Sequence, residues 1–318
     1  MERPIELIKN RSDIGAGTRG ADLGIDAMEI AAINKGSYFF KKYPHIDVPT
    51  RNESIYEIEG NTRAKHIKQI YQQCKDLSSI VENSLMGGNF PLVFSGDHSS
   101  AIGTVAGIRA KFPNKKLGII WIDAHADIHS PYTTPSGNMH GMPIAAILGI
   151  DNTSAKKNDI TPETHAYWEK LKAMVDQSTP IRKEHIVYFG VRDTEEEEDH
   201  LIDKLGIKNF RVEEVQKRGI NSCLEECQTR LQDCEILYIS FDVDSMDSDL
   251  VSEGTGTPVP KGFLPSEVQE IINSLLADKR VTCFEIVEVN PLLDKQGNKM
   301  AEIAFDILEQ AFGLSKTK

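Results

Sequence analysis

Apolar runs of strand length alternate along this chain with stretches of helical periodicity. The apolar runs predict strands at 91–95, 117–123, 185–191, 235–241 and 281–287. The helical periodicity predicts helices at 61–85, 99–111, 161–177, 195–205, 213–232, 265–277 and 301–312. The run Leu-Gly-Ile-Ile-Trp-Ile is typical of a strand covered on both faces. The alternation therefore predicts an α/β fold, with a mostly parallel central sheet flanked by helices.

Composition indicates how many domains the chain forms and which kinds of partner it can bind. No Gly/Ser-rich or Pro-rich linker divides the 318 residues, so we expect residues 1–318 to form a single domain. The hydrophobic fraction of 40% is enough for a sizeable core in a chain of this length. The net charge of −12 argues against a nucleic-acid partner, which would require a basic face.

The sequence also indicates the cellular compartment in which we expect the protein. No window has the roughly 20 consecutive apolar residues of a membrane span, and the first residues lack the apolar core of a signal peptide. Five cysteines predict a cytoplasmic protein without a disulfide framework. The spacing of Cys223, Cys227 and Cys234 favours core packing over metal binding, because no partner pair has zinc-finger spacing.

Acidic and histidine motifs follow each predicted strand. Open parallel sheets place their sites at the carboxyl ends of the strands, so five loops should meet at one edge. These motifs are Gly96-Asp97-His98, Asp123 to His129, Arg192-Asp193, Asp242 to Asp247, and Glu288-Val-Asn-Pro291.

Two of these loops carry carboxylates at alternating positions. Asp123, His125 and Asp127 can point the same way, as can Asp242 and Asp244. Crowded carboxylates repel one another unless cations lie between them. Four aspartates (−4) would be neutralised by two divalent cations, and oxygen and imidazole ligands favour Mn²⁺ ahead of Zn²⁺. Such a pair lowers the pKa of a bridging water, so hydrolysis is the expected reaction.

An ordered set of motifs resembles the ureohydrolase family, and the arginases within it. The resemblance runs from Gly15 to Gly313 and implies a three-layer arginase-like fold with two Mn²⁺ per subunit. The motifs are Gly15-Ala-Gly-Thr-Arg-Gly-Ala-Asp-Leu-Gly24, Gly96-Asp97-His98-Ser99, Asp123-Ala-His-Ala-Asp127, Thr134-Pro-Ser-Gly-Asn-Met-His-Gly141, Ser240-Phe-Asp-Val-Asp244, Gly254-Thr-Gly-Thr-Pro258 and Glu288-Val-Asn-Pro291.

The resemblance implies hydrolysis of L-arginine to L-ornithine and urea by a metal-bridging hydroxide. Two Mn²⁺ would share Asp123 and Asp242 as bridging ligands. One ion would be held by His98, Asp123, Asp127 and Asp242, and the other by Asp123, His125, Asp242 and Asp244.

Three residues have catalytic roles by the same resemblance. Asp127 would accept a hydrogen bond from the hydroxide and pass its proton to the leaving amine. His140 would be a proton shuttle and Glu288 would pair with the guanidinium. Simpler interpretations remain open, because His140 can be an ordinary loop histidine and Glu288 a carboxylate capping the turn before Pro291.

The loop from His129 to His140 bears on the substrate. Thr134, Ser136 and Asn138 match the arginase pattern that binds an α-carboxylate, an element that agmatinases do not usually carry. His129, however, stands where arginases usually have asparagine, which leaves its contact with the substrate open.

Further departures lie in the next two loops. Glu195 stands where arginases usually have aspartate near the α-amino group, and Glu198 matches the glutamate three residues on. Residues 195–198 can equally be an acidic first helical turn. The segment 242–257 is one residue longer than usual, and Thr257 is either a substrate contact or a turn residue.

Several functions therefore stand beside arginine hydrolysis. The same metal core would serve a formimidoylglutamase, an agmatinase or a guanidino-acid hydrolase. A binuclear metallophosphatase is disfavoured because no Gly-Asn-His tripeptide is present, and a purely structural metal site would not require His140 and Glu288. We expect a small guanidino substrate and, from the resemblance, a homo-oligomer that is a trimer or hexamer.

Overall fold

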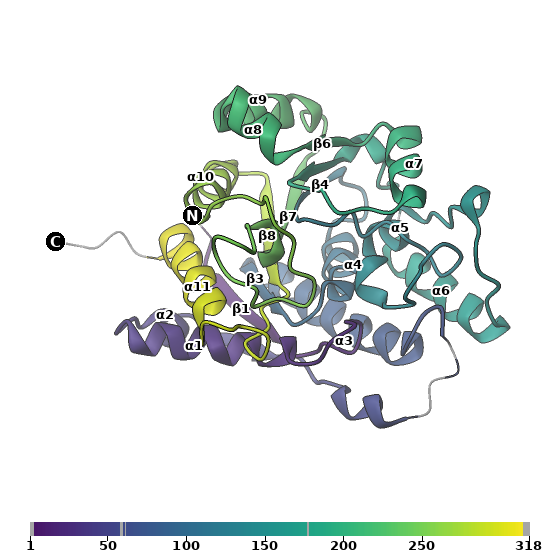
Figure 1. Ribbon diagram of the computed structural model, residues 1–318, viewed down its shortest axis with the longest axis horizontal. Coiled ribbons are helices and arrows are strands. Elements are labelled where there is room, and N and C mark those ends of the chain that lie inside the picture. Colours follow the sequence, from purple (N-terminus) through teal and green to yellow (C-terminus); the bar gives the residue numbers. More distant parts are fainter. Residues whose placement is uncertain (1–2, 58–59, 61, 177, 314–318) are drawn as a thin grey trace.

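A single parallel sheet forms the middle layer of the molecule. The computed structural model describes residues 3–57, 60, 62–176 and 178–313 (Figure 1). Within them the eight strands have the order β2-β1-β3-β8-β7-β4-β5-β6, and every pairing is parallel. The strands are β1 (Ile5–Asn10), β2 (His45–Asp47), β3 (Phe90–Ser95), β4 (Leu117–Ile122), β5 (Ile186–Phe189), β6 (Lys208–Phe210), β7 (Ile236–Asp242) and β8 (Val281–Val287).

Helices cover both faces of this sheet, and two hydrophobic clusters fill the space between the layers. One face packs on α1 (Gly24–Asn34), α2 (Phe39–Lys42), α8 (Val212–Arg218), α9 (Ile220–Arg230), α10 (Pro265–Leu276) and α11 (Lys299–Phe312). The other packs on α3 (Ile67–Met86), α4 (Ala101–Lys111), α5 (Pro143–Leu148), α6 (Pro162–Val175) and α7 (Glu196–Leu205). In Figure 1, α1 and α11 lie side by side at one end of the sheet.

The central strands show why the chain forms this layered structure. All six positions of β4 are buried, with Ile120 and Ile122 in one cluster and Ile119 and Trp121 in the other. Successive strand residues point to opposite faces, so a continuous apolar run supplies both cores. The predicted α/β architecture is confirmed.

Most predicted elements are present, but three strands and three helices of the described residues were not predicted. The five predicted strands correspond to β3, β4, β5, β7 and β8. Strands β1, β2 and β6 and helices α1, α2 and α5 were missed. Strands β2 and β6 are three-residue edge strands with no two-sided apolar run. The absence of that pattern leaves no local signal to detect.

The prediction of one continuous helix at 213–232 is wrong. Residues 213–232 form two helices, α8 and α9, separated at Gly219. Gly219 has φ of +85°, in a region that favours glycine, so the first helix cannot continue through it. The predicted helix 61–85 begins only at Ile67. Its first residue Asn61, and Gln177 at the end of predicted helix 161–177, lie outside the described residues.

The structure also bears on the predictions about the cysteines and about membrane spans. All five cysteines are free and buried. Cys223, Cys227 and Cys234 lie in one hydrophobic cluster, which confirms their predicted packing role. Among the helices described, none combines the length and apolar character needed to cross a bilayer.

The topology brings the chemistry-bearing loops together. The five loops singled out from the sequence follow β3, β8, β7, β4 and β5, which are consecutive in the sheet. Because all strands are parallel, their carboxyl ends share one edge, where sites of such sheets form.

Close packing of α3 against α4 provides a test of this fold. A Cβ at Gly107 would lie 2.6 Å from the Ser78 carbonyl oxygen and 2.7 Å from Val81 Cβ. Overpacking of this kind costs about 1–3 kcal/mol, whereas alanine gains about 1 kcal/mol of helix propensity. Both contacts are shorter than real Cβ contacts and involve atoms that cannot rotate away, so the cost lies in the upper part of that range. We expect Gly107→Ala to lower the free energy of unfolding by about 1–2 kcal/mol in urea denaturation. Ser79→Ala, at an exposed position of α3, should stay within about 0.5 kcal/mol of the parent; equal stability of both variants would contradict the packing argument.

Candidate active site

A cavity of about 270 Å³ lies at the carboxyl ends of the central strands. Each of the five loops contributes to its lining, with His98, Asp127, Asp193, Asp242 and Glu288. The full lining is His98, His125, Asp127, His129, Thr134, Pro135, Ser136, Asn138, His140, Gly141, Asp193, Glu195, Glu198, Asp242, Thr257 and Glu288.

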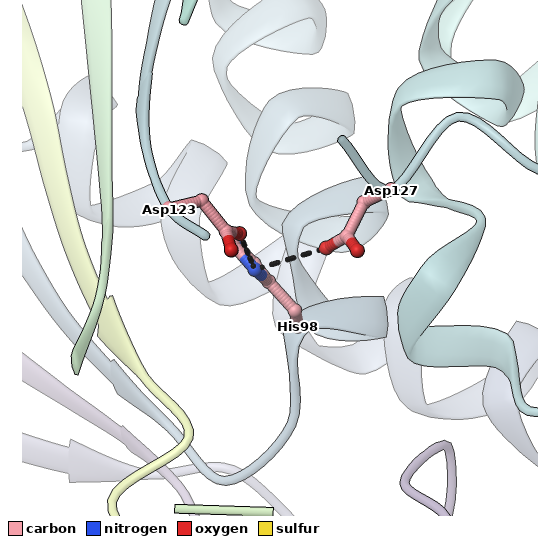
Figure 2. A group of neighbouring side chains, drawn as sticks. All are labelled: His98, Asp123 and Asp127. Atoms are coloured by element: carbon pink, nitrogen blue, oxygen red, sulfur yellow. Dashed lines mark ion pairs between the residues drawn. The ribbon is translucent and has the colours of Figure 1, made fainter. Parts of the chain in front are cut away.

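One group of metal-ligating side chains surrounds the Nδ1 atom of His98. This atom lies 3.0 Å from Asp123 Oδ2, 3.1 Å from Asp127 Oδ2 and 3.3 Å from Asp242 Oδ2. Figure 2 shows the first two carboxylates pointing at the ring from opposite sides. All four side chains are buried. The structure thus brings together residues from the loops after β3, β4 and β7.

The opposite side of the His98 ring is held by the strands. Its Nε2 atom lies 2.7 Å from Ser240 Oγ, and the ring stacks on Trp121 with 3.9 Å between centroids and an angle of 4°. A partner on one ring nitrogen fixes the orientation of the ring and leaves the other nitrogen for a ligand. Sequence reasoning assigned neither residue a role. Both stand two positions before a ligand aspartate, on the same strand face, and that spacing was the available signal.

A second group shares Asp123 with the first. His125 Nδ1 lies 3.0 Å from Asp244 Oδ2 and 3.6 Å from Asp123 Oδ1. The ligand atoms of these three residues could surround one ion. Thr257 donates a hydrogen bond to Asp244 Oδ2 at 3.2 Å, so its side chain supports this group as well as lining the cavity.

The electrostatics of these groups fit divalent cations. Burial, then repulsion from Asp244 and Asp123, raises the pKa of Asp242 well above its usual value. Burial and the charge of Asp123 raise the pKa of Asp127 to about 6. Within the described part of the chain, His98 Nδ1 and Asp123 Oδ2 are buried without a well-aligned hydrogen bond. Cations between these atoms would relieve the repulsion and occupy the unused lone pairs.

Two candidate catalytic residues have left-handed backbones. Asp127 has φ of +50° and Glu288 has φ of +67°. Such conformations cost of order 1–3 kcal/mol and persist where the surroundings hold them. Hydrogen bonds to neighbouring segments hold both backbones. Glu288 N–H donates to the Gly96 carbonyl at 2.9 Å, and Ile144 N–H donates to the Asp127 carbonyl at 2.9 Å. The two carboxylates are therefore directed into the cavity by their neighbours rather than by local preference.

Glu288 and His140 form a pair at the wall of the cavity. Glu288 Oε1 accepts a hydrogen bond from His98 N–H at 3.0 Å and lies 3.1 Å from His140 Nδ1. Its Oε2 atom is buried and makes no hydrogen bond within the described residues. Burial lowers the pKa of His140, but the charge of Glu288 and their hydrogen bond outweigh burial and raise that pKa to about 9. His140 is therefore protonated at neutral pH, and one Glu288 oxygen is available to a donor.

His129 is fully engaged by protein groups. Its Nε2 atom lies 3.0 Å from Glu195 Oε2, and its Nδ1 atom lies 3.0 Å from Thr133 Oγ1. The hydrogen bond from His129 lowers the pKa of Glu195 to about 2, whereas burial raises the pKa of Glu198 to about 8. The interpretation of these residues as an acidic first helical turn agrees with the structure, and their contact with a substrate stays a prediction. Glu195 and Glu198 form the capping box of α7, and both also line the cavity.

The loop that bears on the substrate is closed by its own hydrogen bonds. Thr134 Oγ1 accepts from Gly137 N–H at 3.0 Å, and Ser136 Oγ accepts from Asn138 N–H at 3.1 Å. Asn138 Oδ1 accepts from Lys65 Nζ at 2.9 Å. Sequence reasoning gave Lys65 no role, and nothing in its local sequence pointed to this contact.

Arg192 is another residue whose role was missed, although its motif was noted. Its guanidinium donates to the carbonyl oxygens of Gly190 at 3.1 Å, Asp244 at 3.0 Å and Val259 at 2.7 Å. Gly190 lies in the connection after β5, and Asp244 and Val259 both lie in the connection after β7, so one planar group with several donors ties these two connections together. The connection that carries Asp244 is thereby held in place.

Comparisons with known proteins agree with this geometry. A family model described as the arginase family matches residues 5–313. The arginase of Bacillus caldovelox is 34% identical, with 98% of each chain covered, and that of Brevibacillus brevis is 31% identical, with 98% of this chain and 99% of that one covered. The native crystal structure of the Bacillus caldovelox protein at pH 5.6 superposes with a TM-score of 0.84 at 33% identity, covering 99% of this chain and all of the other. The arginase-like fold expected from the sequence is confirmed.

The crowding of carboxylates predicts a response to metal. We expect Mn²⁺ to raise the Tm of the metal-free protein by roughly 5 °C or more, because binding at 100 times Kd adds about 2.7 kcal/mol. Asp242→Asn should raise the Tm without metal, since repulsion is removed, and abolish the gain with metal. Asp249→Asn, at an exposed position nearby, should behave as the parent in differential scanning calorimetry. A full Mn²⁺ response in Asp242→Asn would contradict this assignment.

Proposed function

The chain belongs to the arginase family of metal-dependent amidinohydrolases, and we propose that it hydrolyses L-arginine to L-ornithine and urea. One observation carries the proposal. A single cavity is lined by the His98 and His125 metal-ligating groups, by Glu288 with a free buried oxygen, and by the Thr134–Asn138 loop. Such a cavity suits a substrate with a guanidinium at one end and polar groups at the other.

The proposed metal content is two Mn²⁺ per subunit. The donor set contains oxygen and imidazole nitrogen but no thiolate, which suits Mn²⁺. When bound, the pair would lower the pKa of water at the site and supply hydroxide near neutral pH. The residues proposed to hold the two ions are His98, Asp123, His125, Asp127, Asp242 and Asp244.

Glu288 would bind and orient the guanidinium. One of its oxygens is held by His98 N–H and His140, so the other oxygen, Oε2, is left to accept from the substrate. A carboxylate next to a planar cation forms directional, charge-assisted hydrogen bonds. The group would therefore hold the guanidinium carbon over the metal-ligating carboxylates.

Asp127 and His140 would move the protons. Hydrolysis adds a hydroxyl to the guanidinium carbon and a proton to the leaving amine. Asp127 lines the cavity beside the proposed metal ligands, so its carboxylate is placed to accept a proton and then return it. His140 Nδ1 faces Glu288, so Nε2 is the ring atom left to exchange a proton with the departing δ-amine or with solvent.

The other end of the cavity supports an amino-acid substrate. Thr134, Ser136 and Asn138 would bind the α-carboxylate, and Glu195 and Glu198 lie where an α-ammonium would be favoured. His129 has both ring nitrogens engaged, so it would shape this end as a wall rather than contact the substrate as a free donor. Thr257 would support Asp244 in addition to any substrate contact.

A second candidate function keeps the same metal core. The departures from the arginase pattern at His129 and Glu195 lie at the amino-acid end of the cavity. They would alter the contacts that select arginine, so another ureohydrolase substrate is the second candidate. Formiminoglutamate, agmatine and guanidino acids are the alternatives.

We further propose that the protein is a single-domain, cytoplasmic homo-oligomer. The one continuous sheet, the five free cysteines and the family resemblance support this proposal.

A substrate panel tests the proposal directly. We expect the Mn²⁺-loaded protein to release urea and ornithine from L-arginine with kcat/KM at least about tenfold above that for agmatine, formimino-L-glutamate or 4-guanidinobutyrate, because only arginine satisfies both ends of the cavity. Product formation is measured by chromatography. Turnover of one of the other three compounds in preference to arginine would overturn the choice of substrate.

The role of His140 gives a second prediction. His140→Asn should lower kcat for L-arginine by about 10²-fold or more, the usual size of a general acid–base contribution, and leave KM within about twofold. His200→Asn, at an exposed position of α7, is the matched control and should keep the parental kcat. An unchanged kcat in His140→Asn would show that another group moves the proton.

A further inference from the structure

We propose that Lys65 is a specificity-determining residue, which gives the cavity its preference for a substrate that carries a carboxylate. The inference rests on the proposed function, because it concerns the amino-acid end of the same cavity. Lys65 does not line the cavity itself. It acts through Asn138, so it is a positioning residue.

Lys65 is fixed against the substrate loop at two points. Its backbone N–H donates to the Gly137 carbonyl at 2.8 Å, and its Nζ donates to Asn138 Oδ1 at 2.9 Å. The two segments approach closely, since a Cβ at Gly137 would lie 2.0 Å from the Thr62 carbonyl oxygen, and Gly137 has φ of +76°. The half-buried Lys65 side chain is therefore held in place rather than free in solvent.

This contact decides which end of the Asn138 amide is offered to a ligand. An ammonium group can only donate, so the atom it contacts is the amide oxygen and the other atom is the NH₂ group. A Cβ at Gly17 would lie 2.5 Å from Asn138 Nδ2, so the NH₂ group lies over a residue that has no side chain. No described residue accepts a hydrogen bond from it. Asn138 lines the cavity and its oxygen is taken by Lys65, so its NH₂ group is the part of the amide left to a ligand, and donors suit a carboxylate.

Charge leads to the same conclusion. The described lining of the cavity contains six carboxylates and no lysine or arginine. Its cationic candidate at this end, His129, already faces Glu195 at 3.0 Å. Glu195 and Glu198 are not among the residues proposed to hold the metal ions, so a carboxylate on the substrate would meet like charge at this end of the cavity. Lys65, one hydrogen bond behind Asn138, supplies a positive charge that offsets this repulsion and polarises the amide donors.

Matched substrates isolate the carboxylate. L-Argininamide differs from L-arginine in replacing the α-carboxylate by a neutral amide. In Lys65→Met we expect KM for L-arginine to rise about tenfold, with kcat within about twofold and KM for L-argininamide unchanged. Lys65→Arg, which keeps a cationic donor, should retain most of the preference. Lys68→Met, an exposed position on α3, is the control for loss of one positive charge and should behave as the parent.

Equal changes in KM for both substrates, or no change for either, would overturn the proposal. A fold defect would appear as a lower Tm of ligand-free Lys65→Met relative to Lys68→Met. In that case Lys65→Arg is the deciding variant, and it must keep the parent's preference for L-arginine over L-argininamide.

A binding measurement separates this inference from the proposed function. L-Ornithine and L-ornithinamide lack the guanidinium and can be compared by the rise in Tm that each produces, without turnover. The parent should gain more from L-ornithine, and Lys65→Met should lose that difference. If the parent hydrolyses no arginine, the proposed function fails while this comparison still decides the role of Lys65. Equal binding of the two ligands by the parent, or an undiminished difference in Lys65→Met, would overturn it.

Discussion

Repulsion among buried carboxylates at the edge of the sheet is the constraint on which the rest of the site depends. Asp123, Asp127, Asp242 and Asp244 are all buried, and burial together with mutual repulsion raises the pKa of Asp127, Asp242 and Asp244. Such a cluster is tolerable only if cations lie between the side chains. Parallel strands supply the means of assembling it, because their carboxyl ends meet at one edge.

Around this cluster the chain places groups that hold the ligands rather than react. Trp121 and Ser240 fix the His98 ring, Thr257 donates to Asp244, and Arg192 ties together carbonyl oxygens of the connections after β5 and β7. These contacts hold the His98 and Asp244 side chains in position. The left-handed backbone at Asp127 is held separately, by the hydrogen bond from Ile144 N–H to its carbonyl oxygen.

The two ends of the cavity differ in how closely they follow the arginase pattern. The end that carries the metal-ligating groups and Glu288 matches that pattern at every residue singled out from the sequence. Two departures, His129 and Glu195, lie at the other end, where they pair with each other. The third, the extra residue in segment 242–257, lies in the connection after β7. There, recognition depends on which donors face the ligand, and Lys65 influences this through Asn138. The residues proposed to carry the reaction and those proposed to select the substrate therefore lie at different ends of the cavity.

The sequence by itself determined the α/β class, five of the strands and the loops that carry the chemistry, because buried strands have continuous apolar runs and alternate residues share a face. The single-domain prediction for residues 1–318 stays a prediction. The tertiary structure alone decided the break at Gly219, the edge strands, the pairing of His140 with Glu288 and the engagement of His129 and Lys65. The reason is physical: periodicity reports local burial, whereas these contacts join loops 66 to 148 residues apart in the chain, and only packing of the layers brings them together.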